Sequence, residues 1–137
     1  MIQRYRAWDN VKKEMFKDTF AITESGQVVV VEQESVASSP DYIFVEHLVI
    51  MQSTGLFDRN GKEIFEGDIV KRYRSPFFKA KWEYQIETVI KEEASLLLGR
   101  EFGKNFGTIP FNSPFAKSDL LEVIGNIYEN PELLEDE

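Results

Sequence analysis

The sequence predicts an all-β protein, a small and partly open β-barrel with an SH3-like core. Three observations carry this prediction: many short runs of β-branched and aromatic residues, turn-forming Gly, Asn and Asp between them, and one long run with a period of two. Its 137 residues, 42% hydrophobic and 13% aromatic, suffice for a real core. We therefore expect one domain over residues 1–137.

The first part of the chain is predicted to be a β region over residues 1–32, followed by a loop over residues 33–41. Phe20–Ile22 and Val28–Val31 flank a segment that contains Gly26, which indicates a hairpin. The loop is rich in serine and contains Pro40, and it holds few large apolar side chains.

The barrel-like core is predicted over residues 42–128. It opens with an apolar run, residues 42–51, that periodicity alone assigns neither to helix nor to strand. The next segments are clearer, because Asp58–Gly61 has the residues of a turn and Glu66–Asp68 turns the chain again into a strand. This strand–turn–strand resembles the arrangement in SH3-like barrels.

The period-two run is the clearest half-buried strand. One face carries Trp82, Tyr84, Ile86, Thr88 and Ile90, while Lys81, Glu83, Gln85, Glu87 and Lys91 lie on the other. Leu120–Tyr128 is predicted as a last strand. Asn130 can cap a short helical turn with Pro131 at its first position, within an acidic tail over residues 129–137.

Composition narrows the possible functions. The chain has no cysteine, which excludes disulfides, thiolate metal sites and cysteine nucleophiles. It has neither a spanning apolar stretch nor a signal-peptide core, so we expect a cytoplasmic protein that does not enter membranes. The net charge of −8 comes mainly from the end of the chain, because residues 119–137 contain seven acids and no Lys or Arg. A DNA mimic needs a broad acidic face and is disfavoured.

Four carboxylates, Asp58, Glu63, Glu66 and Asp68, lie close together in sequence and could form a hydrolytic pair or a metal site. The simpler interpretation is turn formation, in which Asp58 bonds the backbone two residues on. The single histidine, His47, lies in an apolar run and is more simply structural than catalytic. With no phosphate-binding loop either, the sequence predicts no catalytic residue, cofactor or metal, and the protein is not expected to be an enzyme.

A basic and aromatic segment is the candidate for nucleic-acid or partner contact. It combines positive charge for phosphates with aromatic faces for stacking, although the same residues could form a solvated strand edge. Its members are Lys71, Arg72, Tyr73, Arg74, Lys79, Lys81 and Trp82.

A second candidate is the aromatic stretch between residues 102 and 115. Such a stretch either folds back as core or presents apolar surface to a partner or to another subunit. Its members are Phe102, Phe106, Phe111 and Phe115.

Three blocks of the chain resemble the YopX family of phage and prophage proteins: Arg6–Asp9, residues 51–70 and residues 122–134. The resemblance implies expression in the bacterial cytoplasm, and the family has no established activity and no catalytic residue to carry over. The leading hypothesis is thus a protein–protein interaction module, including a homo-oligomer. The alternative is a nucleic-acid-associated accessory factor, and an enzyme based on acidic residues is a third possibility.

Overall fold

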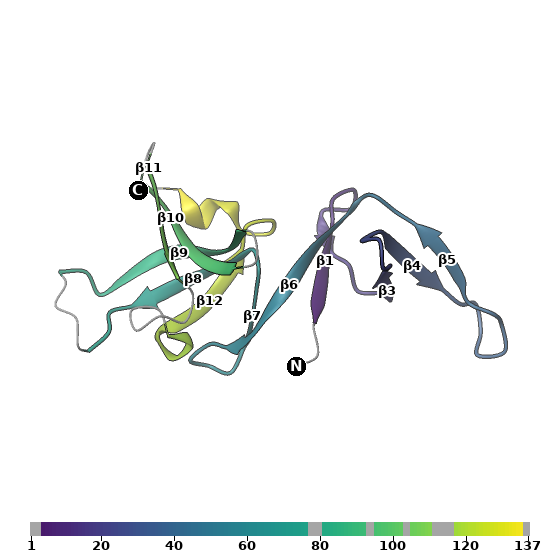
Figure 1. Ribbon diagram of the computed structural model, residues 1–137, viewed down its shortest axis with the longest axis horizontal. Helices are drawn as coiled ribbons and strands as arrows, with labels where there is room; N and C mark the ends of the chain where they lie inside the picture. The colour runs from purple at the N-terminus through teal and green to yellow at the C-terminus, as the bar shows by residue number, and fades with distance from the viewer. Residues whose placement is uncertain (1–3, 77–80, 93–94, 103–104, 111–116, 136–137) are drawn as a thin grey trace. The chain divides into compact units, whose positions relative to one another are not determined.

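The computed structural model describes residues 4–76, 81–92, 95–102, 105–110 and 117–135 (Figure 1). The chain is mostly β, which confirms the predicted fold class. The described strands are β1 (Tyr5–Asp9), β2 (Glu14–Met15), β3 (Phe20–Ile22), β4 (Val28–Glu32), β5 (Asp41–Phe44), β6 (Leu48–Phe57), β7 (Glu63–Phe65), β8 (Asp68–Tyr73), β9 (Tyr84–Glu92), β10 (Ser95–Phe102), β11 (Asn105–Pro110) and β12 (Leu121–Asn126).

The helical content of the described residues is limited to two short 3-10 helices, η1 (Ser118–Leu120) and η2 (Pro131–Leu134). Neither has the length or the apolar character of a membrane-spanning helix. Helix η2 is the predicted helical turn, with Pro131 at its start. The expected side-chain cap is wrong, however, because Asn130 Oδ1 instead accepts the backbone N–H of Asn126 at 3.2 Å.

The described chain divides into two compact units, one of residues 6–50 and one of residues 1–5 with 51–137. We call them the amino-terminal unit and the carboxy-terminal unit. The chain passes between them twice, inside β1 and inside β6, which are the two inner strands of a sheet with the order β2-β1-β6-β7.

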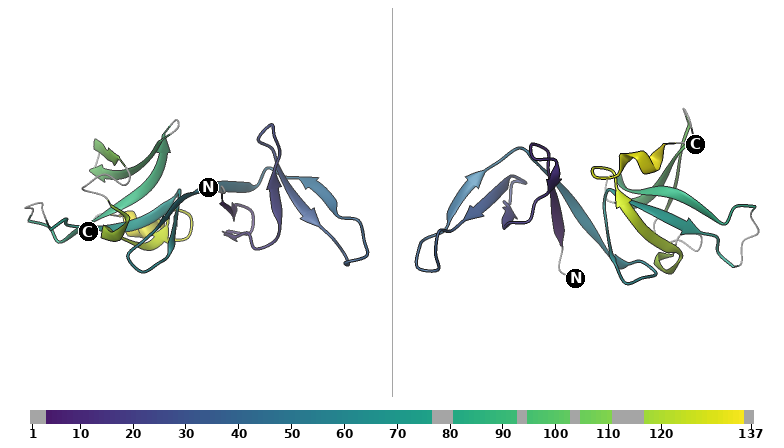
Figure 2. Two further views of the ribbon diagram at one scale, coloured as in Figure 1. Left: turned by 60° about the horizontal axis from the view of Figure 1, so that its bottom comes forward. Right: turned by 180° about the vertical axis from the view of Figure 1, so that it is seen from behind.

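The amino-terminal unit contains a three-stranded antiparallel sheet with the order β3-β4-β5 (Figure 2). The predicted hairpin is present, with Phe20 opposite Val30, and Gly26 adopts a φ of 87° in its turn. The barrel-like core was predicted to start at residue 42, and residues 42–44 lie in β5. Strand β5 pairs with β4, so residues 42–44 belong to the amino-terminal sheet.

The carboxy-terminal unit contains a five-stranded antiparallel sheet with the order β11-β10-β9-β8-β12, curled into a half-barrel (Figure 1). This is the partly open barrel that the sequence predicts. The core of this unit is made by Ile64, Val70, Val89 and Leu121, each fully buried.

The period-two strand is confirmed as β9, but the expected buried face is wrong. Glu87 and Val89 are 2% and 0% exposed, whereas Tyr84 on the other face is 40% exposed. Glu87 can point inward because it has a charged partner. It forms a buried ion pair with Arg72 of β8, which makes an inward carboxylate possible.

Candidate functional site

The turn carboxylates of the carboxy-terminal unit are engaged with the backbone. Asp58 Oδ1 accepts the N–H groups of Asn60 and Lys62 at 2.9 and 2.8 Å, and its Oδ2 accepts that of Val123 at 2.9 Å. Burial raises the pKa of Asp58, but these three hydrogen bonds outweigh it and hold the pKa below its usual value. The predicted Asx turn is confirmed, and the contact with β12 is an addition that the sequence did not reveal.

Asp68 and Asn126 also accept backbone N–H groups, at the turns after β7 and after β12. Asp68 Oδ2 accepts the backbone N–H of Phe65 at 2.7 Å, and Asn126 Oδ1 accepts those of Tyr128 and Glu129. In the described part of the chain, no three His, Asp or Glu side chains are placed to hold a metal ion together. These polar residues thus fix turns of the fold.

Arg72, the centre of the basic segment, points into the protein. Its Nε lies 2.7 Å from Glu87 Oε1, and one terminal nitrogen lies 2.7 Å from the same oxygen and 3.1 Å from Gln85 Oε1. Its side chain is 10% exposed and its guanidinium lies 5.1 Å from the centroid of the Trp82 ring. Arg72 is therefore a structural residue here, and it does not present its charge to a phosphate.

Tyr73 and Lys71 belong to the opposite face of β8. The Tyr73 hydroxyl donates to Glu122 Oε1 at 2.9 Å, which raises the pKa of Tyr73. The Arg59 guanidinium lies 4.2 Å from the Tyr73 ring centroid, and Lys71 Nζ lies 4.5 Å from that of Tyr84. The segment is free of acids in sequence, but sheet pairing brings Glu87 and Glu122 beside it.

The other predicted contact residues fall in three groups. Arg74 and Lys81 are exposed, and Trp82 is half-buried. Lys79, Phe111 and Phe115 lie outside the described residues. Phe102 ends β10 and Phe106 lies in β11, opposite Glu101, and only their backbone is described.

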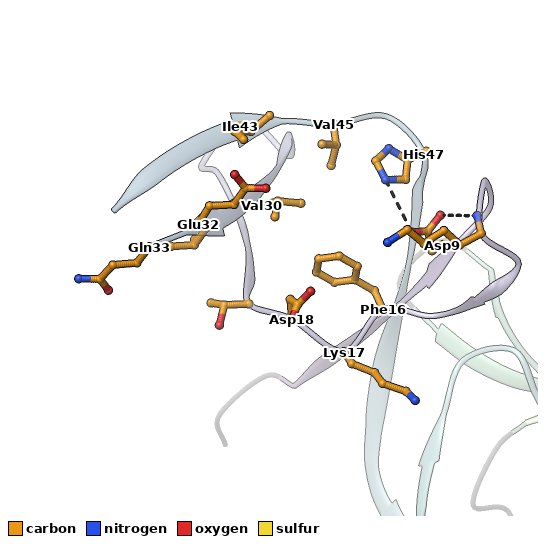
Figure 3. A pocket seen from close by; sticks show the side chains of 13 residues that line it. Asp9, Phe16, Lys17, Asp18, Val30, Glu32, Gln33, Ile43, Val45 and His47 are labelled. Atoms are coloured by element: carbon orange, nitrogen blue, oxygen red, sulfur yellow. Dashed lines mark hydrogen bonds and ion pairs between the residues drawn. The ribbon is translucent and has the colours of Figure 1, made fainter. Parts of the chain in front are cut away.

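The amino-terminal unit has a cavity of about 680 Å³ on one face of its sheet (Figure 3). Its apolar lining includes Phe16, Val30, Ile43 and Val45, and its polar lining carries charges of both signs. At one end, His47 Nε2 lies 3.8 Å from Asp9 Oδ2. The mixed lining gives the cavity no preference for an anion or a cation.

Asp9 itself is committed to the turn that follows β1. Its Oδ1 accepts the N–H groups of Val11 and Lys12, each at 2.9 Å. The hydrogen bond from Lys12, together with that from Val11, lowers the pKa of Asp9 against the effect of burial. Asp9 thus holds this turn, and His47 lies beside it, in line with the structural interpretation of His47.

Among the strands whose side chains are described throughout, β5 is the one in which every residue is exposed. All four of its residues are exposed, with Tyr42, Ile43 and Phe44 at 63%, 43% and 65%. Among residues with described side chains, six of the nine exposed large hydrophobic residues lie in the amino-terminal unit: Val11, Ile22, Val36, Tyr42, Ile43 and Phe44. We take β5 and its side chains as the candidate functional site, because adjacent exposed apolar groups mark interaction surfaces.

The sequence hypotheses did not include this surface. Residues 42–44 form part of an apolar run, which by itself favours burial. Only the strand order β3-β4-β5 places them at an edge. The nearest signal in the sequence is the serine-rich loop immediately before them.

Comparisons with known proteins cover nearly the whole chain. The family model described as "YopX protein" matches residues 4–135. Among solved structures, the chain is similar to protein EF1440 from Enterococcus faecalis, with 29% sequence identity and a TM-score of 0.57 over 98% of this chain and 99% of that chain. The search of curated proteins gives no match. The structural match supports the fold and the family match shows the family, while neither name states an activity.

Proposed function

The chain belongs to the YopX family, and from this premise we propose that it is a non-catalytic protein–protein interaction module of a phage or prophage, acting in the bacterial cytoplasm. The observation that supports this most directly is the exposed sheet of the amino-terminal unit. Tyr42 and Phe44 present adjacent aromatic side chains, and aromatic residues supply much of the binding energy in protein interfaces.

The non-catalytic part of the proposal is supported by how the polar groups are used. The buried carboxylates Asp58 and Asp68 accept backbone hydrogen bonds, and Glu87 is paired with Arg72. A general acid or base needs a carboxyl group that can reach a substrate. These three carboxylates instead hold turns and strands of their own unit.

The alternative, nucleic-acid binding, has less support from the structure than from the sequence. Arg72 is buried in its ion pair, and Tyr73 bonds to Glu122. An electrostatic footprint for nucleic acid needs several cations that face the backbone phosphates together. The exposed cations of the segment with described side chains are Arg74 and Lys81.

A pull-down with a matched pair of variants tests the proposal. Tagged wild type, Phe44→Ser and Phe57→Ser are mixed with nuclease-treated bacterial lysate, and retained proteins are identified by mass spectrometry. Phe57 is the control, since it is 51% exposed but lies in the carboxy-terminal unit. We expect wild type and Phe57→Ser to retain the same partner and Phe44→Ser to lose it. Equal retention by all three proteins, or retention that disappears with nuclease, would contradict the proposal.

A further inference from the structure

We propose that β5 docks on a second copy of this chain, by antiparallel pairing of β5 with β5 of that copy. This inference rests on the proposed interaction function of the same surface and names its partner. The pairing would extend β3-β4-β5 into a continuous six-stranded sheet across a two-fold axis at Ile43.

The backbone of β5 has the hydrogen-bonding phase that this pairing requires. Val45 donates its N–H to the carbonyl of Val28, so residue 45 faces β4. Since backbone groups alternate between the two sides of a strand, Ile43 also faces β4, while those of Tyr42 and Phe44 face the open edge. The outward-facing backbone groups therefore belong to Tyr42 and Phe44, the two most exposed of the three apolar residues in the strand.

The register about Ile43 makes the edge complementary to itself. Tyr42 lies opposite Phe44 of the second copy, and the two residues of such a pair exchange two backbone hydrogen bonds. Their side chains are on the same face, where cross-strand aromatic pairs are stabilising. Ile43 meets its own equivalent on the other face, and Asp41 meets Val45, so no like charges lie opposite each other within β5.

Apart from its short length, the edge lacks the usual protection against pairing. Edge strands are commonly protected by being very short, by lysine, by proline within the strand or by a bulge. Strand β5 contains no Lys or Pro, and its register with β4 runs from Val29 opposite Phe44 to Glu32 opposite Asp41 without a shift. Asp41, at the start, is its one charged residue. A short strand pair buries a small area, so we expect a dimer whose population rises with protein concentration.

A single-cysteine experiment tests the pairing and its register. The chain has no native cysteine, so Ile43→Cys carries the sole thiol. In the proposed register, residue 43 forms a non-hydrogen-bonded pair with Cα atoms about 4.5 Å apart, within the range that a disulfide spans. The control is Val36→Cys, because Val36 is fully exposed and would cross-link at least as fast by random collision.

We expect Ile43→Cys to form a disulfide-linked dimer under mild oxidation, about tenfold faster than Val36→Cys at equal concentration, since pre-association raises the effective concentration of the second thiol. Equal rates for the two variants would overturn the proposal.

A second variant separates failure of this inference from failure of the proposed function. Tyr42→Pro removes an N–H that faces the open edge and leaves the hydrogen bonds to β4 in place. Light scattering of the purified protein over a concentration series should show a dimer for wild type and a monomer for Tyr42→Pro, with both melting cooperatively. A wild type that stays monomeric overturns self-pairing. If the lysate partner is nevertheless retained by wild type and lost by Phe44→Ser, the interaction function stands with a different occupant of β5.

Discussion

The two units of the molecule differ in how many large apolar side chains they leave exposed, among the residues whose side chains are described. In the carboxy-terminal unit, buried polar groups are satisfied by their own unit, as Asp58 is by three backbone N–H groups and Glu87 by Arg72. In the amino-terminal unit, large apolar groups such as Tyr42 and Phe44 remain exposed on a small sheet. This difference agrees with the proposed interaction function, because the exposed apolar groups of the amino-terminal unit are accessible to a partner.

From this comparison we expect substitutions in the two units to have different effects on stability and on association. Changes to the buried polar groups of the carboxy-terminal unit should lower its free energy of unfolding. Changes on β5 should leave the free energy of unfolding almost unaltered and affect association instead.

The largest effect is expected from Arg72→Met. The substitution leaves Glu87, which is 2% exposed, without its ionic partner, and breaking one side of a buried ion pair costs about 3–5 kcal/mol. Urea unfolding measures this loss. The matched control is Lys71→Met on the solvent-facing side of β8, for which we expect a change of less than about 1 kcal/mol. Similar losses for both variants would show that the buried pair is not a main support of the unit.

The second effect is expected from Asp58→Asn. The amide keeps one acceptor oxygen, but its –NH₂ replaces an oxygen of a carboxylate that accepts N–H groups on both sides. An unsatisfied buried donor costs about 1–3 kcal/mol, so we expect a loss of about 2 kcal/mol in urea unfolding. Asp119→Asn, a change in the η1 helix, serves as the control for removal of one negative charge.

The same variant gives a pH prediction. Since the pKa of Asp58 is lower in the folded protein than its usual value of 3.8, its ionised form stabilises the fold at neutral pH. This contribution is fully present above the unfolded-state pKa and is lost as pH falls through the folded-state pKa. Wild type should therefore lose more stability than Asp58→Asn between neutral pH and strongly acidic pH. Parallel stability curves for the two proteins would contradict the assignment.

A smaller loss of stability is expected from Gly125→Ala. A Cβ at this position would lie 2.5 Å from Asn130 Oδ1 and 2.9 Å from Asn130 Cβ, so the backbone of the last turn must move. Overpacking of this kind costs about 1–3 kcal/mol, and we expect the lower end because the close contacts are all with side-chain atoms of Asn130. Gly26→Ala is a useful contrast, because its Cβ meets no atom within 4 Å and only its positive φ is strained.

Much of this fold follows from local patterns in the sequence. The hairpin around Gly26 and the turn at Asp58 depend on residues adjacent in the chain, and both were predictable. Strand β9 was predictable from its period, but its buried face was not. Glu87 becomes an inward residue because of Arg72, fifteen positions away, and a periodicity argument treats every Glu as outward.

The candidate site shows the same limit more strongly. Whether the apolar residues Tyr42 and Phe44 are core or surface depends on which strand lies beside β5. That is a property of sheet order, which local sequence does not carry. Likewise, the basic segment loses its main cation because sheet pairing brings Glu87 to Arg72.

The smallest effect on stability is expected from Phe44→Ser, an exposed residue of the amino-terminal sheet. Phe44 is 65% exposed, so the substitution removes little buried apolar area. The free energy of unfolding should therefore change by less than about 0.5 kcal/mol. The matched change in the same sheet is Val29→Ser, since Val29 lies opposite Phe44 but is only 6% exposed and should cost several times more. Thermal unfolding of the three proteins measures both effects. A large loss for Phe44→Ser would mean that this side chain belongs to the core, and the amino-terminal sheet would then be no more open to a partner than the half-barrel.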